Sequence, residues 1–123
     1  MYTAIVEKTD TGFSAYIDEL GVYSTGSSLT ELSTSLKEAL ELSFEEASKK
    51  IAIEDINLSI DLQQFFKYYR VINAKFLAER IGMNPTLLSQ YVQGRKKASQ
   101  KQTNKILGGL QEIGKELSEL TLA

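Results

Sequence analysis

Five uncharged polar side chains near the middle of the C-terminal half have the chemistry to contact the edges of DNA bases. They are Asn84, Thr86, Ser89, Gln90 and Gln93. Amide side chains can bond adenine bidentately, and a threonine methyl group can pack against the methyl group of thymine. We predict that these residues read bases, because they are expected to lie on the outer side of one short helix.

Two short helices joined by a glycine turn are predicted over residues 73–94. Asn73 caps the first helix, and Gly82 supplies the left-handed residue that ends it. Asn84 caps the second helix, with Pro85 at its first position, where the missing N–H costs nothing. The residues expected to point inward are Phe76, Leu77, Ile81, Leu87, Leu88, Tyr91 and Val92. This is the outline of a helix-turn-helix, whose second helix enters the major groove.

Basic residues are concentrated around this segment. Residues 62–111 hold nine basic residues and one acid, so their net charge is nine minus one, or +8. Four of the basic residues flank the helix pair: Lys75, Arg95, Lys96 and Lys97. We expect these four to contact phosphates, which supply affinity and salt dependence but no sequence choice. The alternative is a solvated basic face that binds no nucleic acid.

The N-terminal half has the opposite charge and a different pattern. Residues 1–60 hold four basic residues and eleven acids, or −7. Period-two alternation predicts three strands, at residues 2–8, 13–17 and 21–26. Ser28 and Glu31 have capping-box spacing and open an amphipathic helix that is expected to reach about Lys50. Residues 54–60 alternate again and are interpreted as a fourth strand or a linker.

The predicted fold class is α+β, in two small domains. Residues 1–60 are expected to form a small sheet with one packed helix, and residues 61–123 an all-helical domain in which Asp61 and Ser99 cap further helices. Domains of about 60 residues are marginal alone, because they bury only about 60% of their unfolded surface. Each domain is therefore expected to gain stability from the other or from a second copy.

The last predicted helix carries a heptad-like apolar seam of Ile106, Leu110, Ile113, Leu117 and Leu120. Gly108, Gly109 and Gly114 interrupt this helix, and each weakens an isolated helix by about 1 kcal/mol unless it permits close approach of another helix. The seam fits either an intramolecular core or a contact between copies. Because helix-turn-helix proteins usually read two half-sites as dimers, we expect a homodimer or a higher homo-oligomer.

The residue inventory argues against an enzyme. The chain has neither Cys nor His, which removes thiolate metal sites and the commonest general base. The adjacent pairs Asp18-Glu19 and Glu45-Glu46 could hold Mg²⁺ for cleavage of nucleic acid. Adjacent residues of a continuing strand point to opposite faces, however, and Glu45-Glu46 is expected on the exposed side of a helix. We expect no catalysis, metal or cofactor; a nuclease that depends on Asp18 is the alternative.

No membrane partner and a cytoplasmic location are expected. The chain has no run of about 18 apolar residues, and its first residues, MYTAIVEKTD, lack the basic and apolar regions of a signal peptide.

The segment LAERIGMNPTLLSQYVQGRKKAS resembles the phage-repressor (Cro-like) helix-turn-helix family. The pattern consists of Leu77-Ala78 on the first helix, Gly82 in the turn, Leu88-Ser89 and Tyr91 on the second helix, then Gly94 and a basic loop. The resemblance covers roughly residues 62–117. Family members often have Gln or Ser where this chain has Pro85, so one common polar contact with DNA is missing here.

The N-terminal half is similar to the N-terminal domain of HicB-type antitoxins. The residues that carry the resemblance are Tyr2-Thr3-Ala4, residues 12–17 (GFSAYI), residues 18–21 (DELG), Gly26 and residues 36–40 (LKEAL). The family often has LPGC where this chain has Leu20-Gly21-Val22-Tyr23.

The resemblance implies a truncated ribonuclease H fold without catalytic residues. It also implies a domain that blocks a small basic RNA-cleaving toxin, HicA, joined to a domain that represses the operon by binding operator DNA. A toxin that grips RNA presents a positive surface, which acidic residues could cover. The candidates are Asp10, Asp18, Glu19, Glu31 and Glu38. The alternative is a DNA-binding transcriptional regulator with no toxin partner, whose N-terminal domain senses a ligand or only dimerises.

Overall fold

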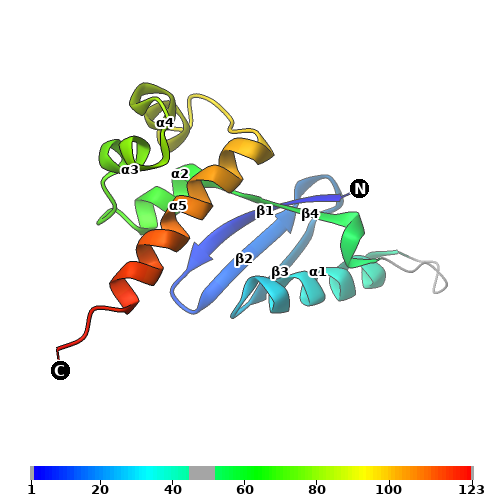
Figure 1. Ribbon diagram of the computed structural model, residues 1–123. Helices are drawn as coiled ribbons and strands as arrows, with labels where there is room; N and C mark the ends of the chain where they lie inside the picture. Colours follow the sequence, from blue (N-terminus) through cyan, green and yellow to red (C-terminus); the bar gives the residue numbers. More distant parts are fainter. Residues whose placement is uncertain (1, 45–51, 123) are drawn as a thin grey trace. The chain divides into compact units, whose positions relative to one another are not determined.

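The computed structural model describes residues 2–44 and 52–122 of the 123-residue chain. The described residues form an α+β structure, with a four-stranded mixed sheet in the N-terminal part and helices mostly in the C-terminal part (Figure 1). The chain divides into two compact units, Met1–Tyr68 (unit 1) and Tyr69–Ala123 (unit 2). The division falls after Tyr68 instead of at the predicted boundary of 60/61, because one short helix packs against the first strand.

The sheet of unit 1 has the strand order β3-β2-β1-β4. Its strands are β1 (Tyr2–Thr9), β2 (Gly12–Ile17), β3 (Val22–Gly26) and β4 (Ile56–Ile60). The first three confirm the predicted strands and form consecutive antiparallel hairpins. Residues 54–60, interpreted as a strand or a linker, contain β4, which pairs parallel to β1 from Tyr2↔Ile56 to Val6↔Ile60.

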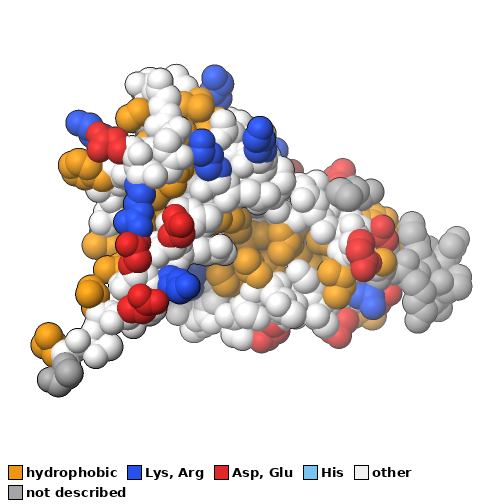
Figure 2. All heavy atoms as spheres, viewed as in Figure 1, with side chains coloured by type: hydrophobic (Ala, Val, Ile, Leu, Met, Phe, Trp, Pro, Cys, Tyr) orange, Lys and Arg blue, Asp and Glu red, His pale blue; other side chains and the backbone are white. Residues whose placement is uncertain are grey.

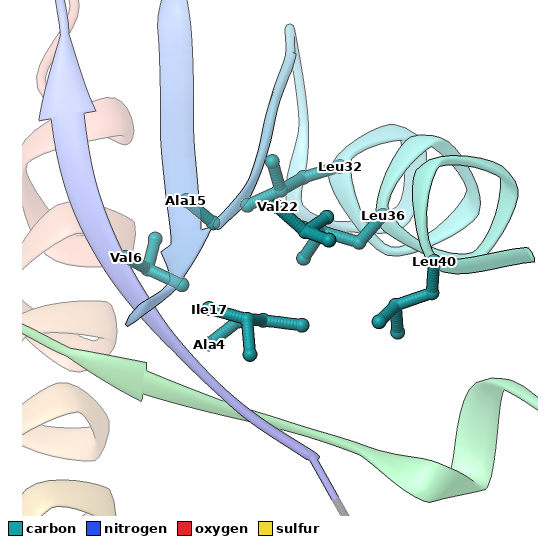
Figure 3. Packing of buried hydrophobic residues seen from close by; sticks show 8 residues of the cluster. All are labelled: Ala4, Val6, Ala15, Ile17, Val22, Leu32, Leu36 and Leu40. Carbon is teal, nitrogen blue, oxygen red and sulfur yellow. The ribbon is translucent and has the colours of Figure 1, made fainter. Parts of the chain in front are cut away.

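One face of the sheet packs against helix α1 (Leu29–Ser43). Leu32, Leu36 and Leu40 are fully buried and point from α1 toward the sheet residues Ala4, Val6, Ala15, Ile17 and Val22 (Figure 3). Burial of each leucine side chain contributes about 1.5–3 kcal/mol. Ser28 caps the helix as predicted, because its Oγ accepts from the Glu31 N–H at 3.1 Å. The prediction that this helix reaches about Lys50 is wrong, because α1 ends at Ser43 and the backbone of Phe44 is extended; Lys50 itself lies outside the described residues.

The start of α1 lies very close to the end of β3. A Cβ atom on Gly26 would lie 2.5 Å from the backbone nitrogen of Leu32, closer than real Cβ contacts allow. Because the neighbouring atoms belong to the backbone of α1, no side-chain rotation could relieve the contact. The absence of a side chain at this position therefore allows the helix to pack on the sheet at this distance.

Helix α2 (Leu62–Tyr68) packs against β1, and one of its side chains forms two hydrogen bonds with that strand. The Gln64 side chain accepts from the Lys8 N–H at 2.8 Å and donates to the Lys8 carbonyl at 2.7 Å. Its amide group therefore pairs with Lys8 as the backbone of a neighbouring strand would. Asp61 caps the helix as predicted, since its Oδ1 accepts from the Gln64 N–H at 3.0 Å. Leu62 and Phe66 are buried. These contacts make α2 part of unit 1.

Unit 2 consists of α3 (Ala74–Ile81), α4 (Pro85–Val92) and α5 (Gln100–Ser118). Its buried side chains include Leu77, Met83, Leu88, Tyr91 and Ile106. The prediction that Phe76 points inward is wrong, because this side chain is 63% exposed. The buried stripe of α3 passes through Leu77 and Ala78, and Phe76 is rotated about 100° from Leu77. Ile81, Leu87 and Val92 are half-buried.

Of the three glycines in α5, Gly109 is the one that contacts another helix. A Cβ atom at Gly109 would lie 2.2 Å from Cγ2 of Ile81 on α3, whereas one at Gly108 or Gly114 would meet nothing within 4 Å. The close approach predicted for these glycines is therefore intramolecular at Gly109. Within the described part of the chain, no helix is both long and apolar enough to cross a membrane.

Candidate nucleic-acid interface

A tight turn connects α3 to α4 through the predicted glycine. Gly82 has φ 71°, in the left-handed region, and its N–H donates to the Glu79 carbonyl at 3.3 Å. The Met83 N–H donates to the Ala78 carbonyl at 2.9 Å, and the Met83 side chain is buried. This pair of bonds is a Schellman motif with its apolar contact. It fixes the direction in which the chain leaves α3, and α4 begins three residues after Gly82, at Pro85.

The first turn of α4 is exposed. The Oδ1 atom of Asn84 accepts from the Thr86 N–H at 2.8 Å, and Pro85 occupies the first helical position. The side-chain oxygen of Asn84 is used by the cap, so the side-chain nitrogen of Asn84 is the group left to contact a base. Asn84 and Thr86 are both exposed, as a base-reading role requires.

The predicted base-reading residues of α4 share one face of the helix. Thr86, Ser89, Gln90 and Gln93 follow each other at intervals of three, one and three residues, which places them along one side. Leu88 and Tyr91, on the other side, are buried. Ser89 and Gln90 are half-buried, and Gln93 is exposed and donates from Nε2 to the Ser89 Oγ at 3.2 Å. All four are uncharged, so this face could approach base edges without a fixed charge of its own.

The basic loop after α4 folds back onto the end of that helix. Gly94 has φ 73°, and the N–H groups of Arg95 and Lys96 donate to the Gln90 carbonyl at 2.9 and 3.3 Å. Arg95, Lys96 and Lys97 are all exposed, as is Lys75 in the first turn of α3. The structure therefore holds the start of the basic run beside the helix whose outer face carries the candidate base-reading residues.

Unit 2 has a net charge of nine basic residues minus four acids, or +5. Two of its cations have partners within the unit: Arg80 forms an ion pair with Glu116, and Lys105 Nζ donates to the Gly82 carbonyl at 3.4 Å. The four candidate phosphate-binding residues are not involved in either contact. Figure 2 shows Lys and Arg side chains spread over this part of the molecule, with Asp and Glu side chains among them.

The five acidic residues predicted to bind a partner do not form one cluster. Asp10 lies in the β1–β2 turn and accepts from the Tyr68 hydroxyl at 2.9 Å, and Glu31 accepts from the Ser27 hydroxyl at 2.5 Å. Asp18 and Glu19 are exposed at the opposite end of β2 from Asp10. Glu38 is exposed on α1. Asp10 and Glu31 therefore have structural partners, whereas the pair at 18–19 lies in a separate turn.

The structure also changes the argument about metal binding. Strand β2 ends at Ile17, and residues 18–20 form a 3-10 turn, so Asp18 and Glu19 are not on a continuing strand as the sequence argument assumed. Among the described residues, no group of three or more His, Cys, Asp or Glu side chains could hold a metal ion. Glu45 and Glu46 lie outside the described residues.

Comparisons of the chain with protein-family models, with curated proteins and with solved structures find no match. The class that the structure itself defines is an α+β chain with two compact units of opposite net charge.

Proposed function

We propose that this protein is the antitoxin of a type II toxin–antitoxin system and represses its own operon. Unit 1, a HicB-like domain of truncated ribonuclease H type, neutralises a small basic HicA-type ribonuclease. Unit 2, a helix-turn-helix domain of the phage-repressor type, binds operator DNA. Both roles are cytoplasmic, and neither requires a cofactor or catalysis by this chain.

The observation that carries the proposal is the division of charge between the two units. Unit 1 holds five basic residues and twelve acids, or −7, against +5 for unit 2. DNA binding draws its affinity from cations that neutralise phosphates, and inhibition of an RNA-gripping protein requires a surface of the opposite sign. One chain with both surfaces suits a protein with two partners of opposite charge.

The DNA-binding role is supported by the local geometry of unit 2. A Schellman turn connects α3 to α4, the outer face of α4 is uncharged, and exposed cations flank that helix. In a helix-turn-helix, α4 would lie in the major groove with Asn84, Thr86 and Gln90 near base edges. Lys75 and the 95–97 run would then contact phosphates on either side.

A homodimer is part of the proposal. The last helix ends at Ser118, so the prediction that its apolar seam continues to Leu120 is wrong. Leu117, in the last turn of α5, and Leu120, just after the helix, are 60% and 76% exposed. These side chains are available to a second copy, and two copies would read two half-sites of an operator.

The proposal is tested by fluorescence anisotropy with a DNA fragment from just upstream of this protein's own coding sequence. The fragment is titrated at two salt concentrations beside an unrelated fragment of equal length. Tight binding that prefers the upstream fragment is expected. Equal binding to both fragments at both salt concentrations would remove the repressor role.

The toxin-binding role needs a separate measurement. Co-expression of the full chain with the HicA-type ribonuclease encoded beside it should restore growth of cells that the ribonuclease arrests. Growth arrest that persists when the two proteins are expressed at equal levels would contradict the toxin-binding role. The protein would then be a DNA-binding regulator without a toxin partner. Mg²⁺-dependent cleavage of nucleic acid by the purified chain, lost in Asp18→Asn, would instead identify a nuclease.

A further inference from the structure

The face of the sheet opposite α1 carries two neighbouring tyrosines. Alternation along β2 and β3 places Tyr16 and Tyr23 on this face, and the two residues are directly paired across the strands. Ile5 of β1 is paired with Tyr16 in the same row. Directly opposed residues of an antiparallel pair have Cβ atoms about 4.5–5.5 Å apart, so the two tyrosines are neighbours on this face, and together they are called the aromatic surface below.

This aromatic surface is exposed. Tyr16 is 36% exposed and Tyr23 is 63% exposed, and Leu20 in the turn between their strands is 39% exposed. Within unit 1, α1 packs on the other face, and Gln64 fixes α2 at the Lys8 end of β1. An exposed apolar patch of this kind is typical of a surface that binds another molecule.

Two acidic residues lie in the turn that joins the two tyrosine-bearing strands. Asp18 and Glu19 are exposed in the 3-10 turn Asp18–Leu20, and no basic residue occurs between Tyr16 and Tyr23. Gly21, with φ 63°, ends the turn, and its N–H donates to the Asp18 carbonyl at 3.2 Å. The hairpin thus presents two aromatic rings and two carboxylates on a turn whose backbone is already fixed.

We infer that this hairpin, residues 16–23, is the surface on which the basic ribonuclease docks. An arginine or lysine of the partner would lie over the tyrosine rings by cation–π attraction, and its cationic head would pair with Asp18 or Glu19. Tyrosine is also one of the residue types that most often dominate binding energy at protein interfaces. This inference rests on the toxin-binding role proposed above and specifies its site.

The other candidate acids are less suited to this role. Asp10 already accepts a hydrogen bond from Tyr68, and Glu31 from Ser27. Glu38 is exposed on α1, on the side of the sheet away from the tyrosines. In the hairpin, two exposed acids that are not placed in either of these hydrogen bonds lie in the turn between the two exposed tyrosines, so the hairpin combines charge complementarity with apolar area.

The test is isothermal titration calorimetry of the full chain with a catalytically inactive form of the HicA-type ribonuclease encoded beside it. Tyr23→Ala and the double variant Asp18→Asn/Glu19→Gln should each weaken binding about tenfold or more. The double variant should also flatten the dependence of affinity on salt. Leu42→Ala on α1 and Glu54→Gln in the exposed turn before β4 are matched apolar and acidic controls, and both should bind within about twofold of the natural chain.

Circular dichroism of each variant checks that it is folded. Leu20→Ala, in the turn outside the strands, is a second apolar variant of the hairpin and should also weaken binding. Hairpin variants that bind as tightly as the natural chain would overturn the inference and leave the toxin-binding role intact. Absence of binding by the natural chain itself would overturn both. Sedimentation of the free protein checks for self-association. If Tyr23→Ala lowers the mass of the assembly in solution, the tyrosines belong to a contact between copies, and the inference is overturned.

Discussion

The side chain of Gln90 can be removed without disturbing the turn that surrounds it. The bonds from Arg95 and Lys96 go to the Gln90 backbone carbonyl, so Gln90→Ala keeps the end of α4 intact. We predict that this variant binds its operator about 1–3 kcal/mol more weakly and discriminates less between bases at one position. Anisotropy with single-base operator variants measures both effects. Unchanged operator affinity would remove Gln90 from the base-reading set.

Lys96 is predicted to act differently, because its side chain is an exposed cation beside α4. Lys96→Ala should weaken binding to the operator and to unrelated DNA by similar factors. It should also make the slope of log affinity against log salt shallower by about one unit, since one fewer phosphate is neutralised. A loss confined to the operator sequence would contradict a phosphate contact.

Gln64 offers a test of how α2 is held on the sheet. Gln64→Glu keeps an oxygen that can accept from the Lys8 N–H but loses the group that donates to the Lys8 carbonyl. We predict a loss of about 1–3 kcal/mol in the free energy of unfolding, because a polar group loses its partner. Urea denaturation measures the loss, and Gln111→Glu, at an exposed position of α5, is the control.

At the scale of elements, the glycines of α5 should respond in opposite ways to the same substitution. Gly109→Ala would place a methyl group against Ile81 and should destabilise unit 2 by about 1–3 kcal/mol through overpacking. Gly114→Ala meets open space and should stabilise the helix by about 0.5–1 kcal/mol. Thermal unfolding distinguishes them. Stabilisation by both substitutions would contradict the close packing of α3 on α5.

The helix caps and hairpins could be predicted because their causes are local. Asn73, Asn84 and Ser99 each bond an N–H two or three residues ahead, and Gly82 ends α3 by its own left-handed conformation. These effects need only the residue type and its immediate neighbours. The strands followed from alternation for the same reason.

Features that depend on tertiary packing could not be predicted in this way. Whether Phe76 is buried depends on which side of α3 contacts the other helices, and the sequence of α3 alone has apolar residues on more than one side. The role of Gln64 depends on a strand residue 56 positions away. The pairing of Tyr16 with Tyr23 depended on the exact register of a hairpin, although alternation already placed each tyrosine opposite the core residues.

At the scale of the whole molecule, charge is divided between two compact units. In the proposed function, each partner binds the unit whose charge is opposite to its own. Unit 2 is small, and a single α4 offers few base contacts. Two copies acting together would double those contacts and make the operator distinguishable from other DNA. The exposed end of α5 at Leu117, with Leu120 just after the helix, is the surface proposed for this association.

This leads to a prediction about the spacing of operator half-sites. A dimer reads two half-sites about 10–10.5 base pairs apart, or a multiple of that spacing, because both must face the protein. Insertion of about five base pairs between them turns one half-site to the opposite side of the duplex. We therefore expect such an insertion to reduce affinity to that of a single half-site.

Anisotropy with the natural operator, the inserted operator and a half-site fragment measures this effect, and Leu117→Ser provides the matched protein variant. Leu117→Ser should lower the mass measured by sedimentation and bind the natural operator no better than the half-site fragment. Both results would follow from the same cause, since the insertion separates the half-sites and the substitution separates the copies. If the insertion does not change the affinity of the protein for the operator, a single copy of α4 reads the DNA alone.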